Sequence, residues 1–451
     1  MKMIYNVKDK PKFGQLIVFA FQQLLAIMAA TIAVPMIVGN GMSTSAALFG
    51  AGIGTLVYVL FTKKKSPVFL GSSFAFLGSM ATAFAGAVTA GLGYLGLIIG
   101  AIFAGLVYVV IAIIVKVAGV KWISKIMPAV VIGPIVAIIG LSLAGNAIGD
   151  LQKSNLEGGS SYVAIICGLI TLAVVMLCSV YGKKMARLIP FIIGILAGYI
   201  AATIFYFIGK ATGNAALMVI DYSALTNNFS TISLSSFIAV PDFSFLKAFG
   251  AFADLTPAYI GTIAVAYIPV AFVVFAEHIA DHKNLSSIIE HDLLEDPGLS
   301  RTLLGDGIGS MAGAFFGGCP NTTYGESIGC VAITKNASVN TIIVTACEAI
   351  LISFIAPFVA FLSTIPSCVM GGVCIALYGF IAVSGLKMLQ KVDLDDNRNL
   401  FTASVILITG VGGLVLTFGQ ITLTTVACAL ILGILTNVML GRKKSDKKSD
   451  K

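Results

Sequence analysis

Three carboxylates lie within strongly apolar stretches of the chain: Glu277, Glu326 and Glu348. A charge in such surroundings is costly, so it marks a functional position unless a partner explains it. Glu277 lies in the run VVFAEHIADH at 273–282, and Glu326 follows the small and polar stretch PNTTYG at 320–325. Glu348 stands between Cys347 and apolar residues, and we interpret it as structural. The first two carboxylates are therefore the candidate site.

Glu326 stands where a half-helix is expected to begin. The first N–H groups of a helix have no partner within it, and the helix dipole favours an anionic or carbonyl-bearing ligand there. Two acidic side chains beside such N–H groups suit a ligand with alternating N–H donors and C=O acceptors. Nucleobases fit this description, as do an amide or a small peptide. The alternatives without a binding function are a cytoplasmic helix end at Glu277 and a structural helix cap at Glu326.

Groups that could exchange protons follow Glu277 within about one helical turn. Asp281 and His282 are candidates for this role, and Glu277 itself is a third; a solvated interfacial pair is the alternative for Asp281 and His282. His291 lies in a charged loop and is interpreted as solvated. The eight cysteines lie mostly in apolar runs without C-x-x-C spacing, which predicts neither metal sites nor disulfides.

No nucleotide-binding or nucleophilic motif accompanies these residues. The chain contains no G-x-x-x-x-G-K-[ST] sequence, so no ATP-binding P-loop is expected, and no Ser–His–Asp arrangement is recognisable. We therefore expect neither an enzyme nor a cofactor. Transport, if that is the function, would be driven by a gradient.

The composition indicates that these groups lie in a membrane. Of the 451 residues, 58% are hydrophobic and only 11% are charged, against about 25% charged in ordinary soluble domains. Such a chain cannot cover a water-facing surface, which excludes a soluble enzyme, a disordered chain and a disulfide scaffold. Its apolar runs approach or exceed the ~20 residues that cross a bilayer, which predicts an all-α polytopic membrane protein.

Charge separates the apolar runs into fourteen expected transmembrane segments. They lie near 15–39, 44–62, 67–85, 89–115, 127–148, 160–181, 188–209, 257–280, 301–318, 323–339, 340–364, 367–386, 400–418 and 421–440. With a cytoplasmic N-terminus, all Lys and Arg residues except Lys153, Lys210 and Lys247 fall on the cytoplasmic side. This asymmetry is the positive-inside rule, and it predicts that both termini are cytoplasmic. The net charge of +8 then reflects topology, and no nucleic-acid partner is expected.

The polar stretch 210–256 divides the segments into two sets of seven, so the halves have opposite orientations and form a 7+7 inverted repeat. The third segment opens with GSSFAF at 71–76, and the tenth opens with PNTTYGE at 320–326. Both carry small, hydroxyl-bearing residues with β propensity where an ordinary span has Leu and Ile. Paired interrupted segments of this kind indicate the binding site of a transporter, although small residues also mediate helix packing.

These motifs resemble the nucleobase–ascorbate transporter family, and within it the bacterial uracil permeases. The similarity rests on VFAEHI at 274–279, PNTTYGESIGCVAITK at 320–335, GSSFAF at 71–76, Val34–Pro35 and the loop DPGL at 296–299. The resemblance implies short β-strands that open segments 3 and 10. It also implies a core domain made of 1–126 and 257–365, and a gate domain made of 127–256 and 366–451.

The resemblance also implies roles for individual residues. Glu277 and Glu326 would hydrogen-bond the base, Phe74 and Gly325 would contact it through their backbone, and Tyr324 would form a wall of the pocket. Proton coupling and a homodimer are implied as well. Three positions depart from the family pattern, namely Asp281 in place of His, Gln23 in place of His and Ser327 in place of Asn. The first departure leaves the coupling role open among Glu277, Asp281 and His282.

From these observations we expect a carrier that imports uracil across the plasma membrane by proton symport with alternating access. Sodium is the alternative coupling ion, and xanthine or another purine is the alternative substrate. An anion carrier or channel of related fold is a more distant alternative, because an anion site would favour Arg or Lys over two carboxylates.

Overall fold

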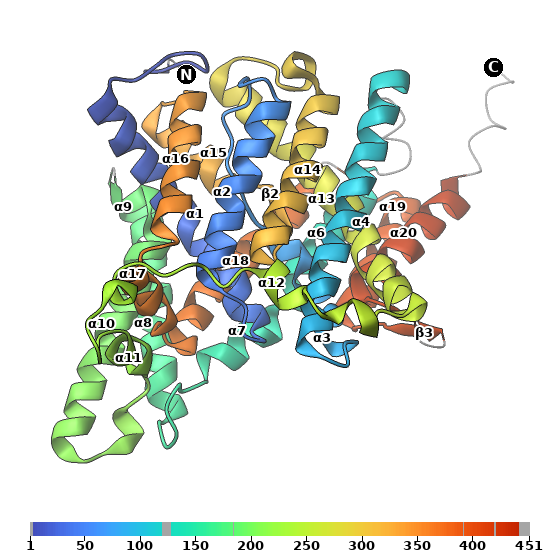
Figure 1. The fold of residues 1–451 in the computed structure, drawn as a ribbon. Coiled ribbons are helices and arrows are strands. Elements are labelled where there is room, and N and C mark those ends of the chain that lie inside the picture. The colour runs from blue at the N-terminus through green and yellow to red at the C-terminus, as the bar shows by residue number, and fades with distance from the viewer. Residues whose placement is uncertain (1–2, 120–127, 184, 391, 419–420, 442–451) are drawn as a thin grey trace, which may run out of the picture.

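The computed structural model describes residues 3–119, 128–183, 185–390, 392–418 and 421–441, and these residues are mainly helical (Figure 1). The helices before residue 213 are α1 (Phe13–Val38), α2 (Thr44–Phe61), α3 (Leu77–Ala85), α4 (Ala90–Ala118), α6 (Ala129–Ser142), α7 (Ala144–Leu151), α8 (Ser161–Tyr181), α9 (Met185–Leu188) and α10 (Pro190–Thr212). Those after residue 256 are α13 (Pro257–Ile289), α14 (Leu299–Gly317), α15 (Gly325–Thr334), α16 (Val339–Ile352), α17 (Ala356–Ser363), α18 (Ser367–Leu389), α19 (Asn397–Val411) and α20 (Thr425–Gly441).

Short elements complete the description. The stretch between α10 and α13 contains α11 (Ser223–Asn228), α12 (Ser244–Ala248) and the single turns Ala215–Leu217, Leu234–Ser236 and Ala251–Asp254. The strands are β1 (Leu70–Ser72), β2 (Asn321–Thr323), β3 (Leu416–Phe418) and β4 (Ile421–Leu423). β1 and β2 precede α3 and α15, where strands were predicted. The β3–β4 hairpin, by contrast, lies where the sequence indicated the end of one span and the start of the next.

Several expected spans are interrupted. The stretch 340–364, taken as one span, contains two helices, because α16 ends at Ile352 and α17 begins at Ala356. Pro357 explains the break, since proline has no N–H group to continue the hydrogen bonds of α16 but is well tolerated in the first turn of α17. Within the described residues, eight helical segments, with α6 and α7 counted as one, are long and apolar enough to cross a membrane. The count of fourteen spans stays a prediction.

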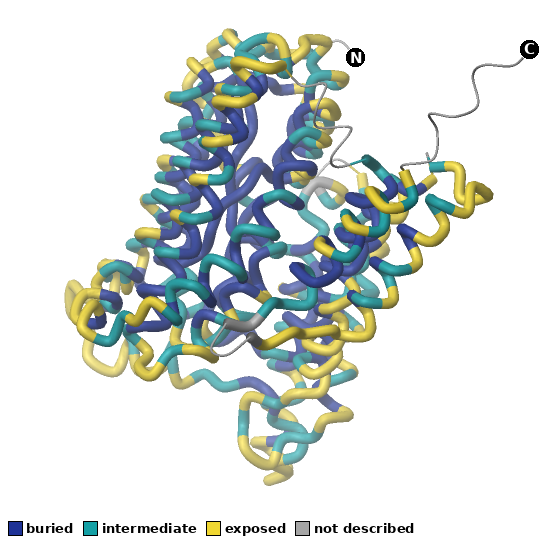
Figure 2. The backbone as a smooth tube through the Cα atoms, turned by 90° about the vertical axis from the view of Figure 1, so that its right-hand side faces the viewer, coloured by how far each residue is buried: buried dark blue, intermediate teal, exposed yellow. Residues whose placement is uncertain are grey.

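An exposed apolar stripe on α4 fits a lipid-facing surface. Leu106, Val110, Ile113 and Val117 follow one another at intervals of three or four residues and are all exposed. This spacing places them on one face of the helix, and a water-soluble protein would have to cover such a face. Figure 2 shows the same pattern in the whole molecule, where buried positions concentrate inside the helix bundle and exposed ones lie around it.

The long helices pack in two groups. In the first, α14 packs against α2 and α4, α13 packs against α4, and α16 packs against α1 and α2. In the second, α18 packs against α6, α7 and α8, α10 packs against α8, and α19 packs against α6 and α20. Glycines allow close contact within the first group: a Cβ atom on Gly50 would lie 2.4 Å from the carbonyl oxygen of Gly313, so a larger residue there would separate α2 from α14.

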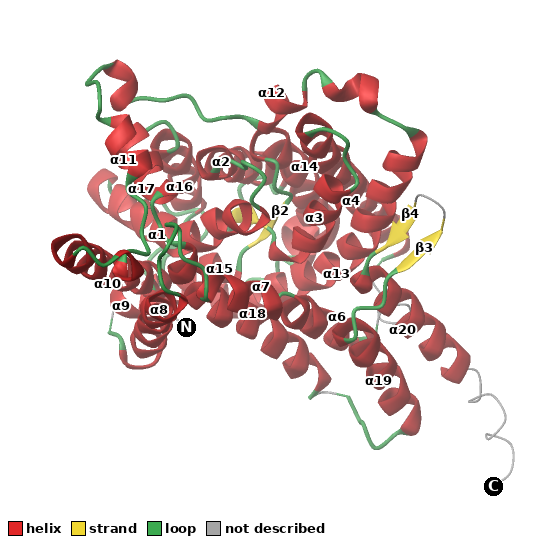
Figure 3. Ribbon diagram, turned by 90° about the horizontal axis from the view of Figure 1, so that it is seen from below, coloured by secondary structure: helices red, strands yellow, loops and turns green. Residues whose placement is uncertain are grey.

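The strands β1 and β2 meet inside the first group. They pair antiparallel, with Leu70 opposite Thr323 and Ser72 opposite Asn321. Seen from below (Figure 3), β2 lies in the middle of the bundle, whereas the β3–β4 hairpin lies at its edge. Each central strand is only three residues long and is followed by a helix that begins within the bundle. Two helix N-termini are thereby brought together deep in the molecule.

Candidate functional site

A cavity of about 420 Å³ lies between the two groups of helices, next to the paired strands. From the first group it is lined by residues of the β1–α3 and β2–α15 segments and of α13, and from the second by residues of α6, α10 and α18. The lining includes six of the predicted site residues: Phe74, Glu277, Asp281, Tyr324, Gly325 and Glu326. The structure therefore brings these residues, which were predicted from the sequence, together around one cavity.

The strand pairing positions the backbone groups of the site. Ser73 N–H donates to Pro320 O (2.9 Å) and Tyr324 N–H donates to Phe69 O (3.2 Å), which fixes the residues just before each helix start. Phe74 then begins a single helical turn that leads into α3, and Gly325 begins α15. Because the first N–H groups of a helix have no partner within it, both helix starts offer donors to the cavity.

Two features shape the wall beside Gly325. The Tyr324 hydroxyl donates to Ser72 O (2.7 Å), and its ring lies where a Cβ atom on Gly71 would be, about 2.3 Å from that position. Only glycine at 71 therefore admits the ring. A Cβ atom on Gly325, by contrast, would meet no atom within 4 Å. The backbone at Gly325 is thus open, and a ligand can approach it closely.

The acidic side chains come from two elements. Glu277 and Asp281 lie one turn apart on α13, and Glu326 lies in the first turn of α15. Thr323 Oγ1 donates to Asp281 Oδ2 at 2.7 Å, so β2 orients this carboxylate. Glu326 stands at a helix N-terminus, where the dipole stabilises a negative charge. The arrangement can accept N–H groups of a ligand and donate backbone N–H groups to its carbonyl oxygens.

Two residues that line the cavity carry buried hydroxyl groups that sequence reasoning did not single out. Ser73 and Thr322 are 1% and 4% exposed, and within the described residues their hydroxyl oxygens have no hydrogen-bond partner. A buried polar group without a partner is costly. The hydroxyl-rich motifs were the available signal, but strand register decides which hydroxyls face the cavity.

His282, the third candidate for proton exchange, is not among the residues that line this cavity. It is buried, its Nδ1–H donates to His278 O (2.8 Å), and its Nε2 lies 2.7 Å from the Tyr58 hydroxyl. The Tyr58 hydroxyl also lies 2.7 Å from Ser66 Oγ. The ring therefore links α13 to α2 and to the loop before β1.

His278 anchors the same helix to α14. Its Nδ1 lies 2.6 Å from Asp306 Oδ2 and its Nε2 lies 3.0 Å from Thr302 Oγ1, and all three side chains are fully buried. His278 and His282 are one turn apart and their rings stack at 4.0 Å. These contacts fix how α13 is turned about its axis, and hence which side chains it presents to the cavity. The sequence pattern EHIADH contains both sets of residues but does not show which set faces the site.

Two of the three departures from the family pattern are in direct contact. The Gln23 amide donates to Ser327 Oγ and also to Ser327 O, the latter at 3.3 Å. Ser327 Oγ accepts a further hydrogen bond from Phe69 N–H at 3.0 Å. The pair joins α1 to the first turn of α15 and to the residue before β1. Gln23 and Ser327 therefore form one hydrogen-bonded unit at the start of α15, although they are 304 residues apart in the chain.

The DPGL loop lies outside the cavity. Lys65 Nζ donates to Asp296 Oδ1 at 2.5 Å, and this hydrogen bond holds the pKa of Asp296 below its usual range. His291 Nε2–H donates to Asp296 O at 2.9 Å. The loop joins the end of α13 to the segment before β1, so its match to the family motif has a structural explanation.

The described residues contain no cluster of three His, Cys, Asp or Glu side chains that could hold a metal ion. All eight cysteines are free.

Comparison with known proteins places the chain in a family. It matches the permease family (Xan_ur_permease) over residues 14–418. It is 40% identical to the uracil permease of Bacillus caldolyticus, in an alignment that covers 97% of this chain and 95% of the other. The chain belongs to the nucleobase–ascorbate transporter family. The uracil permease of Bacillus subtilis is 37% identical over 99% and 97% of the two chains. The chain described here is therefore an integral membrane permease and not an enzyme.

Solved structures with the same fold are more distant. The transmembrane domain of the cyanobacterial bicarbonate transporter BicA is 15% identical and superposes with a TM-score of 0.62, with 96% of this chain and 99% of that one covered. The murine anion transporter Slc26a9 is 11% identical with a TM-score of 0.62, over 96% and 69% of the two chains. At such low identity these likenesses show a shared transporter fold alone.

Proposed function

We propose that this permease imports uracil across the plasma membrane together with a proton. The observation that carries the proposal is the convergence of Glu277, Glu326 and two helix N-termini on one cavity. In the proposed complex, the N–H groups of uracil donate to the two carboxylates. The backbone N–H groups of Phe74 and Gly325 donate to its carbonyl oxygens, and the Tyr324 ring forms a wall. The relatives named as uracil permeases support this choice of base.

Charge explains why a proton would accompany the base. Among the described residues, the cavity is lined by Glu277, Asp281 and Glu326 and by no Lys, Arg or His side chain. Moving uncompensated carboxylates through the low-dielectric part of the membrane is costly, so a proton on one of them makes the loaded site easier to move. One inward charge is worth ~2.3 kcal/mol per 100 mV, enough for roughly 50-fold accumulation. The same lining argues against an anion as substrate.

The packing supports an alternating-access mechanism. The helices of 1–126 and 257–365 contact one another extensively, as do those of 127–256 and 366–451. We propose the first set as the core domain and the second as the gate domain, related by an inverted repeat and moving as rigid bodies with the cavity between them. Both termini are placed in the cytoplasm, in keeping with the distribution of Lys and Arg, and the carrier is proposed to act as a homodimer.

Uptake of labelled uracil into proteoliposomes, with and without an inward proton gradient, tests the proposal. We expect the gradient to drive accumulation that unlabelled xanthine does not compete. If xanthine competes with uracil and is itself taken up, the proposed substrate is wrong but the proposed site still holds. If only a sodium gradient stimulates uptake, the coupling ion is sodium and not a proton. Absence of uptake for both bases would reject the proposed function.

Substituting Asp281 tests the coupling group. In Asp281→Asn the amide oxygen can still accept the Thr323 hydroxyl, so the local geometry is kept while the titratable group is lost. If Asp281 carries the proton, uptake by wild-type protein rises as external pH falls, whereas uptake by the variant is independent of pH. At a membrane potential of 100 mV, the ratio of internal to external uracil should then fall from roughly 50 to about one. The variant should still exchange internal for external uracil.

Asp296→Asn is the matched control, because Asp296 is a carboxylate in the loop outside the cavity. Its pH profile should match that of the wild type. An unchanged pH profile in Asp281→Asn would return the coupling role to Glu277 or His282.

A further inference from the structure

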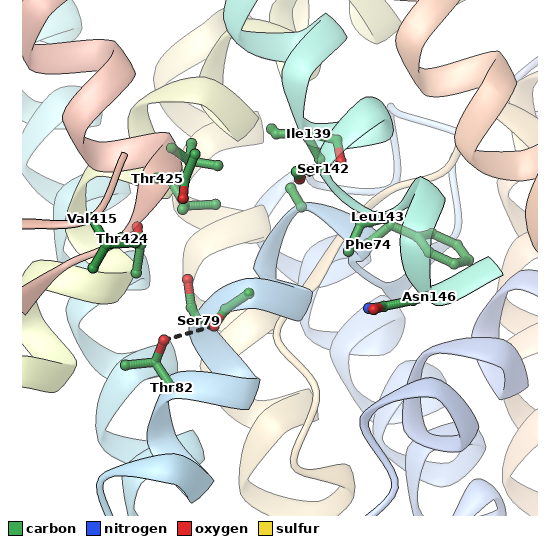
Figure 4. A pocket seen from close by; sticks show the side chains of 14 residues that line it. Phe74, Ser79, Thr82, Ile139, Ser142, Leu143, Asn146, Val415, Thr424 and Thr425 are labelled. Carbon is green, nitrogen blue, oxygen red and sulfur yellow. Dashed lines mark hydrogen bonds between the residues drawn. The ribbon is translucent and has the colours of Figure 1, made fainter. Parts of the chain in front are cut away.

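A second cavity adjoins the first. It has a volume of about 300 Å³ and shares Phe74, Ala75 and Ile139 with the cavity of the candidate site. Figure 4 shows side chains from α3, from α6 and α7, and from the segments next to the β3–β4 hairpin around this space. In the predicted topology these are the extracellular ends of their segments. We call this space the outer cavity, and the shared residues form the partition between it and the site.

Apolar surface predominates in the outer cavity, and none of the described residues that line it is charged. Its polar groups are one amide, that of Asn146, and five hydroxyl side chains, those of Ser79, Thr82, Ser142, Thr424 and Thr425. This contrasts with the three carboxylates of the inner cavity. A charged solute would gain no counter-ion from these lining residues, so the chemistry suits a neutral molecule.

Three of the five hydroxyl groups donate to backbone carbonyls, whereas Thr424 Oγ1 accepts a hydrogen bond from Ala427 N–H at 3.4 Å. The Thr82 hydroxyl donates to Gly78 O (2.9 Å), that of Ser142 to Ile139 O (3.0 Å) and that of Ser79 to Ala266 O (2.7 Å). Each hydrogen is thus committed to a backbone carbonyl, while the oxygen keeps a lone pair for another donor. Within the described residues, no hydrogen bond joins the Asn146 amide to another group. Asn146 can therefore both donate to and accept from a ligand.

We propose that the outer cavity is a second binding site for the neutral nucleobase, which it occupies on the way to the inner site. Ring N–H groups of the base donate to the hydroxyl oxygens, a carbonyl of the base accepts from Asn146, and the Phe74 ring forms part of the wall. Hydrogen bonds between neutral groups are about half as strong as those to a carboxylate, so the outer site binds more weakly. The base therefore passes inward toward tighter binding. This inference rests on the proposed function.

Gly78 offers a way to fill the outer cavity without disturbing the fold. It lines the cavity, and a Cβ atom on it would meet no atom within 4 Å. Gly78→Leu should therefore project into the open space. Gly145→Leu is the matched control, because Gly145 lies on the neighbouring α7, also has no atom within 4 Å of an added Cβ, and is not among the lining residues.

The first measurement is the initial rate of labelled uracil uptake by cells that lack other uracil carriers. Gly78→Leu should raise the KM of uptake about tenfold, while the Kd of the purified protein for uracil at the inner site stays unchanged. Gly145→Leu should change neither value. An unaltered KM in Gly78→Leu overturns the proposal, as does a parallel loss of inner-site affinity, because the latter would indicate a structural effect.

The second measurement is equilibrium binding of uracil to protein with a disabled inner site. Gly325→Val, whose side chain fills the inner site, should retain weak binding that Gly78→Leu removes and Gly145→Leu does not. Complete absence of residual binding, or residual binding that survives Gly78→Leu, overturns the outer site. If Gly325→Val binds uracil as tightly as the wild type, the proposed inner site fails instead, and the outer site is then decided by the KM of Gly78→Leu alone.

Discussion

Glu326→Gln should weaken uracil binding about 100-fold. The carboxylate lies in the first turn of α15 and lines the inner cavity, where it would accept an N–H group of the base. Hydrogen bonds to charged groups contribute about 1.5–3 kcal/mol, and neutral ones about half as much. The amide loses the charge-assisted bond and can also turn its NH2 group toward the N–H of the base, which adds repulsion. The two effects together correspond to roughly two powers of ten in Kd.

Equilibrium binding of labelled uracil to purified protein measures this effect without the complication of turnover. Glu348→Gln is the matched control, because Glu348 is a half-buried carboxylate on α16 that does not line the inner cavity. It should bind uracil as the wild type does. Unchanged affinity in Glu326→Gln would remove this residue from the site, whereas equal losses in both variants would point to a general effect of carboxylates on the fold.

The sequence pointed to the candidate site because the chemistry of these residues conflicts with their apolar surroundings. Glu277 and Glu326 are conspicuous in apolar stretches, and the motifs around residues 72 and 322 interrupt apolar runs with hydroxyl groups. The structure brings these features together in one cavity and pairs the two strands. Such local conflicts are visible in a sequence because a membrane span otherwise has little reason to contain them.

Contacts between distant segments were not predictable in the same way. Gln23 and Ser327 were recognised as separate departures from a family pattern, yet they hydrogen-bond to each other. His282 was grouped with Glu277 by spacing, and His278 stands between the two, yet both histidines bond to neighbouring helices and neither lines the cavity. Helical periodicity places residues on a face, but only the packing of neighbouring helices determines what that face meets.

The division of α13 into two faces has a functional consequence. One face carries Glu277 and Asp281 into the cavity, and the other is held by His278 and His282. A proton or ligand that changes the charge of the first face therefore acts on a helix whose rotation is restrained by buried hydrogen bonds. Such restraint favours movement of α13 together with α2 and α14 as a body over rotation of α13 alone.

Gly325→Val should abolish uracil binding at the inner site while leaving the protein folded. A Cβ atom at this position meets no atom within 4 Å, so the added side chain begins in open space. Valine is also less costly than glycine within a helix. In the proposed complex, however, the N–H group of Gly325 donates to a carbonyl of uracil, and two additional methyl groups would occupy the space through which the base approaches. Gly325→Ala, with a single methyl group, should weaken binding about tenfold.

The control for this steric effect is Gly329→Val. Gly329 lies one turn further along α15, and a Cβ atom on it also meets no atom within 4 Å, but it does not line the inner cavity. Thermal unfolding of all three variants should resemble that of the wild type, and only the two substitutions at Gly325 should reduce binding. Native affinity in Gly325→Val would contradict close approach of the base to this backbone. We expect the loss of uracil affinity to be larger for Gly325→Val than for Gly325→Ala, and Gly329→Val to bind as the wild type does. Because none of these variants removes a side chain, this result would show that uracil contacts the backbone at the start of α15.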